Sequence, residues 1–252
     1  MNNKAKFLQR NVPCYLYKED LIKEHCHDLL NTMPGVDFLY SIKTNPFMPV
    51  LKTVATQSFG ADAASANEVL MAHEAGIPCD KIYYSAPGKT LQDLEKVWGK
   101  CTIIADSLSE LARLEQCAEV KNECISIGVR VNPNFSMNGE SVVSSKFGID
   151  ENQLKTADLC FPHLKIIGIH VHLRSQSEFC IVGRNENCET VDIVGNLCTA
   201  LDVMAKNITL PHAEIGDILA VSNAGSYGCT LTPLLFSNQE TPKEFLWTKE
   251  NE

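Results

Sequence analysis

Five ionisable residues of this chain occupy matching places, each at or just beyond the end of a short apolar run. They are Lys43, Asp62, Asp106, Arg130 and His172. In the segment YSIKTNP at 40–46, a lone lysine is most simply explained by an ammonium that extends from a strand end into water. Five groups of both charge signs in matching places are poorly explained in that way. Together they indicate an active site, where such groups bind ligands and move protons.

The apolar runs that carry these residues alternate with amphipathic stretches. The runs are VDFLYSI, FGADAA, KIYYSA, CTIIAD, SIGVRVN and IIGIHVHL. Stretches with helical spacing lie between them, such as ANEVLMAHEAG, which Gly76 should end, and SLSELARLEQCAEV, where Ser107 and Glu110 predict a capping box. Because the runs do not alternate between polar and apolar residues, they predict parallel strands that are buried on both faces.

This βα order is compatible with a βα barrel or with a doubly wound sheet. The shared position of the five ionisable groups favours the barrel, because the C-terminal ends of its strands form the rim where active sites are built. We therefore predict an α/β fold, with a TIM-type βα barrel at residues 1–178 in which about six of the eight βα units are recognisable. Residues 179–252 contain short strands and turns instead, which predicts a small β-rich C-terminal domain.

The composition argues against several classes of partner. The net charge is −9 and no basic run is longer than a pair, which is unfavourable for binding nucleic acid or an anionic membrane surface. No apolar stretch is as long as a membrane span and the N-terminal residues contain no apolar signal region, so we expect a soluble, cytoplasmic protein. The 11 cysteines are scattered without C-x-x-C spacing, which is typical of reduced, apolar cysteines, and we expect no metal site.

Several segments in order resemble one enzyme family. These segments are VPCYLYKEDL, FLYSIKTNP, FGADAASANEV, IGVRVNPNF, SKFGI, IIGIHVHLRSQ, GNLCTALD and GDILAVSNAGSYG. They are similar to the pyridoxal-phosphate-dependent decarboxylases of the ornithine and diaminopimelate decarboxylase type. Those enzymes join an alanine-racemase-like barrel to a C-terminal β domain. The resemblance covers nearly the whole chain and implies an amino acid as substrate, pyridoxal 5′-phosphate as cofactor, and a homodimer with shared active sites.

The resemblance also implies a role for individual residues. Lys43 would form the Schiff base with the cofactor, and Cys198 would be the proton donor, reaching the site of the partner subunit. The other residues implied to bind the cofactor are Asp62, Arg130, His172, Ser175 and Tyr227. Thr199 and Asp202 would contact the substrate. The chemistry suits a lysine in a partly buried place, because its amine forms an imine only when it is unprotonated.

The chain departs from the family pattern between HVHLRSQ and GNLCTALD. The family has there a glycine-rich turn that holds the phosphate and a Glu-Pro-Gly-Arg segment whose glutamate pairs with the pyridine nitrogen. Neither is found in this sequence, which we interpret as an internal deletion of two barrel strands. In addition, Arg174 stands where the family has a glycine, and Thr199 stands where ornithine- and diaminopimelate-type enzymes have an acidic residue.

Two functions remain open on these grounds. The first is the pyridoxal-phosphate-dependent decarboxylation of an amino acid, with Lys43, His172 and Cys198 as the working residues. The alternative is a catalytically impaired homologue that acts as a regulatory or partner subunit of an intact decarboxylase. A cofactor carrier of the same barrel type is disfavoured, because the β-domain segment and Cys198 are both present.

Overall fold

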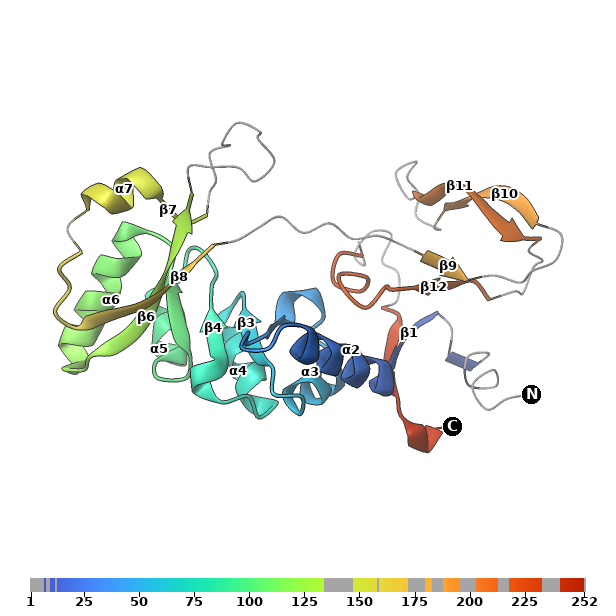
Figure 1. Ribbon diagram of the computed structural model, residues 1–252, viewed down its shortest axis with the longest axis horizontal. Helices are drawn as coiled ribbons and strands as arrows, with labels where there is room; N and C mark the ends of the chain where they lie inside the picture. Colours follow the sequence, from blue (N-terminus) through green and yellow to red (C-terminus); the bar gives the residue numbers. More distant parts are fainter. Residues whose placement is uncertain are drawn as a thin grey trace. The chain divides into compact units, whose positions relative to one another are not determined.

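The computed structural model describes residues 7, 10–11, 13–133, 147–157, 159–171, 180–182, 188–194, 203–212, 218–232 and 241–251 (Figure 1). The chain forms two compact units. One comprises Met1–Leu16, Ser175–Phe245 and Asn251–Glu252, and the other, larger unit comprises Tyr17–Arg174 and Leu246–Glu250. The boundary predicted between residues 178 and 179 lies outside the described residues. None of the helices in the described part is long and apolar enough to cross a membrane.

The larger unit is built on a parallel sheet of seven strands in the order β2-β3-β4-β5-β6-β7, with β8 also paired to β6. The strands are β2 (Leu39–Ser41), β3 (Gly60–Ala63), β4 (Ile82–Tyr84), β5 (Thr102–Ala105), β6 (Ile125–Asn132), β7 (Ile149–Asp150) and β8 (Leu164–His170). Every pairing in this sheet is parallel. The βα order predicted from the sequence is therefore confirmed, and the short β7 is an addition that the sequence pattern did not indicate.

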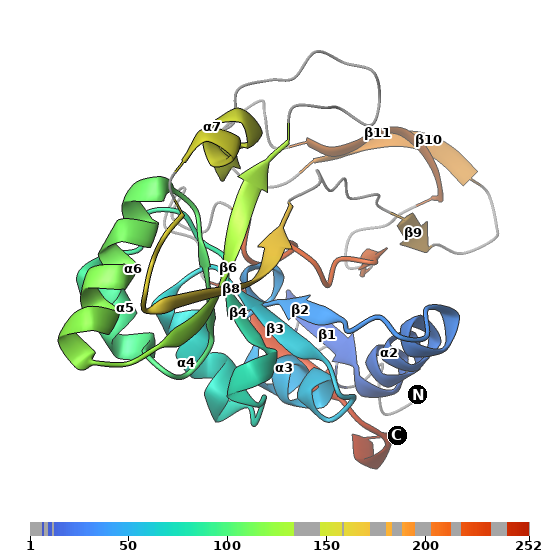
Figure 2. The ribbon, with the colours of Figure 1, turned by 60° about the vertical axis from the view of Figure 1, so that its left-hand side comes forward.

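Helices alternate along the chain with most of the strands of this sheet. They are α2 (Glu19–Thr32), α3 (Met48–Ala55), α4 (Ala66–Glu74), α5 (Leu91–Val97), α6 (Leu108–Lys121) and α7 (Glu151–Thr156), with short 3₁₀ turns η1 (Ile42–Thr44) and η2 (Cys79–Lys81). Figure 2 shows α3, α4, α5 and α6 along one side of the curved sheet. This arrangement leaves the C-terminal strand ends free to carry the candidate site.

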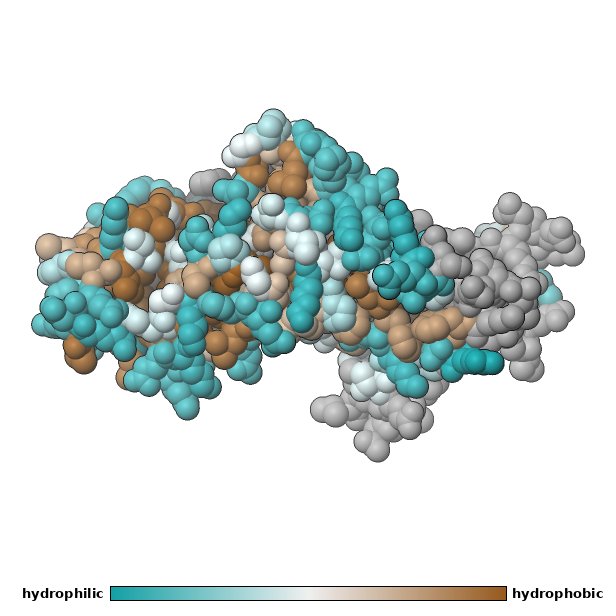
Figure 3. Space-filling view, turned by 90° about the horizontal axis from the view of Figure 1, so that it is seen from below, coloured by the Kyte–Doolittle hydropathy of each residue, from teal (hydrophilic) through white to brown (hydrophobic). Residues whose placement is uncertain are grey.

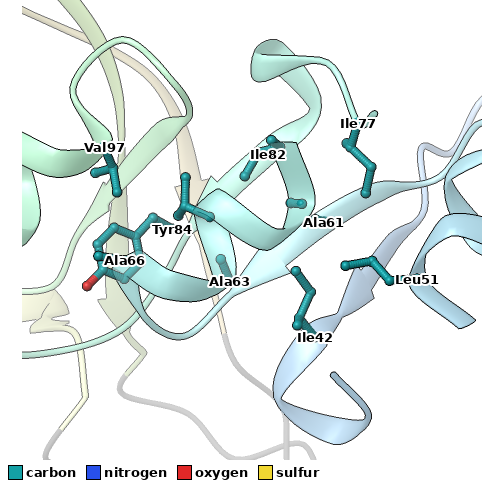
Figure 4. Packing of buried hydrophobic residues seen from close by; sticks show 11 residues of the cluster. Ile42, Leu51, Ala61, Ala63, Ala66, Ile77, Ile82, Tyr84 and Val97 are labelled. Carbon is teal, nitrogen blue, oxygen red and sulfur yellow. The ribbon is translucent and has the colours of Figure 1, made fainter. Parts of the chain in front are cut away.

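Two clusters of buried side chains form the core between sheet and helices. The first contains Ile42, Leu51, Ala61, Ala63, Val69, Ile82 and Val97 among others (Figure 4). The second contains Leu94, Ile103, Ala105, Leu111, Leu114, Ile127, Val129 and Ile149. Four consecutive residues of β6, from 127 to 130, are buried, as expected of a strand with both faces covered. The absence of polar–apolar alternation in the sequence has this physical cause.

Strand β8 is an exception to the predicted burial. Its Ile166, Ile167 and Ile169 side chains are 40%, 53% and 70% exposed. In the described part of the chain, β8 pairs with β6 alone and is an edge strand of the sheet. On the face of the molecule shown in Figure 3, hydrophobic residues are interspersed with hydrophilic ones.

The helix ends test two local predictions. Helix α4 ends at Glu74, and Gly76 follows with a φ of +91°, so the predicted glycine stop is confirmed. Helix α6 begins as predicted at Ser107, whose Oγ accepts from the Glu110 N–H at 3.2 Å. A capping box also needs the Glu110 carboxylate to accept from the Ser107 N–H. This part of the prediction is wrong, because the carboxylate accepts from the Asp106 N–H instead.

The smaller unit contains antiparallel ladders. Strand β10 (Cys188–Val194) pairs with β11 (Val203–Pro211), and β9 (Cys180–Val182) pairs with β12 (Ala220–Ser222). Apart from these ladders, strands β1 (Cys14–Lys18) and β13 (Lys243–Trp247) form a further two-stranded sheet, and the turn η4 (Lys249–Asn251) follows. The β-rich character predicted for the C-terminal part is confirmed in the residues that the structure describes.

Candidate active site

Polar residues gather at the C-terminal edge of the parallel sheet. Lys43 lies in η1 directly after β2, Asp62 lies near the end of β3, and Ser85 follows β4. Asp106 follows β5, and Arg130 lies near the end of β6. Because the strands are parallel neighbours, these ends lie on one rim.

Asp62 has both carboxylate oxygens engaged by serines of the neighbouring strands. The Ser41 Oγ donates to Asp62 Oδ2 at 2.9 Å, and the Ser85 Oγ donates to Asp62 Oδ1 at 2.5 Å. Ser41 is also the β2 residue directly opposite Asp62 in the strand pairing, and the turn that carries Lys43 begins at the next residue. The carboxylate is thus held in one orientation beside that turn. Two small serines give no pattern in a sequence, so their role was missed.

The turn that carries Lys43 is braced by its own polar residues. The Asn45 N–H donates to the Ile42 carbonyl at 3.0 Å, and the Thr44 Oγ1 donates to the Ser41 carbonyl at 2.8 Å. Asn45 is 4% exposed, and its carbonyl accepts from the Tyr40 hydroxyl at 2.8 Å. The residues of TNP therefore form a fixed turn that presents the half-buried Lys43 at the rim.

Glu68 is a second acidic group near this lysine that the sequence reasoning missed. Its Oε2 accepts from the Ala64 N–H at 2.7 Å, at the start of α4. Burial raises the pKa of Glu68; the Ala64 N–H lowers it, the charge of Asp62 raises it, and the charge of Lys43 lowers it. Glu68 is therefore electrostatically coupled to both Lys43 and Asp62, and it is a carboxyl group able to carry a proton near the lysine.

Asp106 and Arg130 form a buried ion pair on the other side of the rim. The Arg130 Nη1 lies 3.2 Å from Asp106 Oδ1, and it also donates to the Ser85 carbonyl at 3.3 Å. The Asp106 and Arg130 side chains are 8% and 7% exposed, and the guanidinium lies 4.5 Å from the centre of the Phe147 ring. Ser85 thus connects Arg130 to Asp62, because its hydroxyl donates to the Asp62 carboxylate.

A second buried ion pair lies beneath this one. Lys89 Nζ is 2.8 Å from Glu110 Oε1, with side chains that are 0% and 4% exposed. Burial lowers the pKa of Lys89, and the Glu110 carboxylate opposes that effect. The sequence reasoning missed this lysine, because in SAPGKT it follows a Pro-Gly turn and there indicates an exposed loop.

Several residues with a predicted role lie outside the described residues. These are His172, Ser175, Cys198, Thr199 and Asp202, together with Arg174. Tyr227 is described, but it belongs to the smaller unit, where it lies in a turn after β12 with a φ of +62° and its carbonyl accepts from the Leu231 N–H. Its place near a cofactor phosphate stays a prediction. The structure brings together Lys43, Asp62, Asp106 and Arg130 on one rim.

The chemistry of this rim fits an aldehyde cofactor that carries a phosphate. The half-buried Lys43 lies on the turn that follows the partner strand of a fixed carboxylate, and the buried Arg130 guanidinium lies at the end of β6. An amine can hold an aldehyde carbon, and a guanidinium can donate hydrogen bonds to a phosphate.

Comparison with known proteins agrees with this geometry. Residues 19–207 match the family model described as the pyridoxal-dependent decarboxylase, pyridoxal binding domain. The L-glutamyl-[BtrI acyl-carrier protein] decarboxylase of Niallia circulans is 34% identical over 175 residues, which cover 66% of this chain and 41% of that protein. The diaminopimelate decarboxylase of Zymomonas mobilis is 30% identical over 185 residues, covering 67% of this chain and 44% of that protein. The chain thus spans about half the length, or less, of these curated relatives.

Solved structures show the same fold. A mutant form of the diaminopimelate decarboxylase of Helicobacter pylori, complexed with L-lysine, has a TM-score of 0.84 at 18% identity, covering 100% of this chain and 95% of that one. The enzyme of M. jannaschii has a TM-score of 0.84 at 17% identity, covering 97% and 89%. These neighbours confirm the predicted α/β fold, a TIM-type βα barrel followed by a β domain. From the matched domain and the fold, we conclude that the chain belongs to the family of pyridoxal-phosphate-dependent decarboxylases.

Proposed function

We propose that this chain binds pyridoxal 5′-phosphate covalently through Lys43 and decarboxylates an amino acid, in the manner of the diaminopimelate decarboxylases that it is similar to. One observation carries the proposal. The braced turn after β2 presents Lys43 at the rim beside Asp62, whose two carboxylate oxygens are held by Ser41 and Ser85. A lysine on a braced turn and a fixed carboxylate at strand ends suit the attachment of this cofactor.

Each rim residue has a distinct task in this proposal. Lys43 Nζ would hold the aldehyde carbon of the cofactor, and it can do so only as the unprotonated amine. Glu68 is the group that can accept a proton near that amine, because burial raises its pKa and the charge of Lys43 acts on its carboxyl group. Arg130, fixed by Asp106 and the Ser85 carbonyl, supplies positive charge at the rim. When bound, pyridoxal phosphate accepts the electrons of the bond between Cα and the departing carboxylate.

The remaining residues enter the proposal through the family resemblance alone. His172 would pack against the pyridine ring, Ser175 and Tyr227 would contact the phosphate, and Cys198 would return a proton to Cα. Thr199 and Asp202 would face the substrate side chain. Cys198 would come from the partner subunit, which requires a homodimer with shared sites. The exposed isoleucines of β8 support association, because apolar surface of this kind is commonly covered in an assembly.

Borohydride reduction tests the attachment at Lys43. The protein is incubated with pyridoxal phosphate, reduced, digested and mapped by mass spectrometry. We expect one pyridoxyl adduct on Lys43 that is lost in Lys43→Ala. The matched control is Lys52→Ala, an exposed lysine of α3, which should leave the adduct unchanged. Labelling that is spread over surface lysines and is the same in Lys43→Ala would contradict the proposal.

A second candidate function is that of a cofactor-binding partner subunit of an intact decarboxylase. The specific observation in its favour is internal to the sequence: between HVHLRSQ and GNLCTALD it contains neither the glycine-rich turn nor the Glu-Pro-Gly-Arg segment of the family. A carbon-dioxide release assay with a panel of amino acids separates the two functions. A protein that forms the Lys43 adduct and releases no carbon dioxide by itself supports the partner role.

A further inference from the structure

We infer that the buried pair Lys89–Glu110 positions Asp106 and Arg130 for the cofactor, an inference that rests on the proposed function. Lys89 and Glu110 act through the backbone groups of Ala86, Ile104 and Asp106, so they are positioning residues and not catalytic ones.

The Lys89 ammonium uses all of its hydrogen-bond donors. Its ammonium donates to the Ala86 carbonyl at 2.6 Å, to the Ile104 carbonyl at 2.7 Å and to Glu110 Oε1 at 2.8 Å. A lysine has three N–H donors, so all of them are used. The two carbonyls belong to the segment after β4 and to β5, and Glu110 belongs to α6. One side chain therefore ties together the segment after β4, strand β5 and helix α6.

Glu110 connects Lys89 to Asp106 on the rim. While Oε1 of Glu110 accepts from Lys89, its Oε2 accepts from the Asp106 N–H at 3.3 Å. Asp106 in turn forms the ion pair with Arg130, whose Nη1 also donates to the Ser85 carbonyl. The segment after β4 contains both Ser85 and Ala86, so Lys89 holds the second anchor of Arg130 as well. Both partners of Arg130 are thus fixed from the same buried ammonium.

The location of the buried charges also favours a positioning role. Among the described residues, the buried side chains with a formal charge are Lys89, Asp106, Glu110 and Arg130. Removing charges from water is costly, and replacing a buried ion pair by apolar residues is often neutral or stabilising. Stability alone therefore gives little reason for a Lys–Glu pair in this core. A specific reason is that the pair contacts Asp106 and the segment of Ser85, which hold Arg130.

The test compares the unsubstituted protein with the double variant Lys89→Met with Glu110→Leu, which removes both charges and leaves no unpaired one. The matched control is Lys155→Met with Glu151→Leu, an ion pair of 2.6 Å on α7 in which Lys155 is 65% exposed. Thermal unfolding verifies that both variants fold. Crystal structures without cofactor then show the position of the Arg130 guanidinium, and a fluorescence titration gives the Kd for pyridoxal phosphate.

We expect the double variant to fold, to lose the contacts of Arg130 with Asp106 and Ser85, and to bind pyridoxal phosphate about tenfold more weakly, which equals about 1.4 kcal/mol. The control variant should change neither the contacts of Arg130 nor the Kd for pyridoxal phosphate. A folded double variant with unmoved Arg130 and unchanged Kd would show that Lys89 and Glu110 serve the core alone and would overturn the inference. If the wild-type protein does not bind the cofactor, the proposed function fails. Even then, the crystal structure of the double variant without cofactor shows whether the Lys89–Glu110 pair holds the Arg130 guanidinium in place.

Discussion

Replacing Lys89 alone by methionine should lower the free energy of unfolding by about 3–5 kcal/mol. Methionine retains most of the volume and the unbranched shape of the lysine stem, so the substitution leaves no large cavity. What it removes is the ammonium at the centre of three hydrogen bonds. The Glu110 carboxylate, 4% exposed, is then left buried without its counter-ion.

The magnitude follows from what remains in the core. Breaking a buried ion pair by removing one partner costs about 3–5 kcal/mol, because an uncompensated charge stays in a medium that solvates it poorly. The carbonyls of Ala86 and Ile104 also lose a donor. Since domains are stable by about 5–15 kcal/mol, this loss is a large fraction of the total. The additional substitution Glu110→Leu should recover most of it, because the unpaired charge is then gone.

Urea denaturation monitored by tryptophan fluorescence and circular dichroism measures the change. The control is Lys155→Met, which breaks an exposed pair within α7 and should cost well under about 1 kcal/mol. A loss below about 1 kcal/mol for Lys89→Met would refute the reasoning, since it would mean that Glu110 is not held in a poorly solvated place.

Three further predictions concern other parts of the chain. Burial raises the pKa of the Cys101 thiol from 9.0 to about 12, so Cys101 should resist thiol reagents at about pH 8 in the folded protein. Between those two pKa values the unfolded chain releases this proton and the folded one retains it, so this thiol should make stability fall as pH rises, a contribution that Cys101→Ala should remove. Thr199 cannot pair with a buried distal ammonium, so ornithine and lysine should be poor substrates, and strong turnover of ornithine in a carbon-dioxide release assay would contradict this. Mixing inactive Lys43→Ala and Cys198→Ala chains should restore part of the activity if two chains share each site, whereas an active monomer by light scattering would exclude that model.

The order of the elements could be predicted because the signals are local. Each βα unit has an apolar run that a parallel strand buries on both faces, followed by a stretch with helical spacing. Gly76 and Ser107 mark helix ends through the conformation and side chain of single residues. Since parallel strands place their C-terminal ends on one edge, the rim positions of Lys43, Asp62 and Arg130 followed from chain order alone.

The exposure of β8 could not be read in the same way. Its residues LKIIGIH have the composition of a strand covered on both faces, yet the isoleucines are exposed. Whether the side chains of an apolar strand are covered depends on the elements that pack on the two faces of the sheet. The sequence of a strand alone does not show which elements pack against it.

The polar network beneath the rim was decided by the tertiary structure alone. Lys89 is separated from the Ile104 carbonyl by 15 residues and from Glu110 by 21, and the three groups meet only when the segment after β4, β5 and α6 pack together. A lysine after Pro-Gly and a glutamate in the first turn of a helix have ordinary local explanations, as an exposed loop residue and as a cap. By itself, the sequence determined which side chains stand at the strand ends. Which of them are held in place, and by which buried charge, depended on the packing, because burial and hydrogen-bond partners are properties of elements brought together in space.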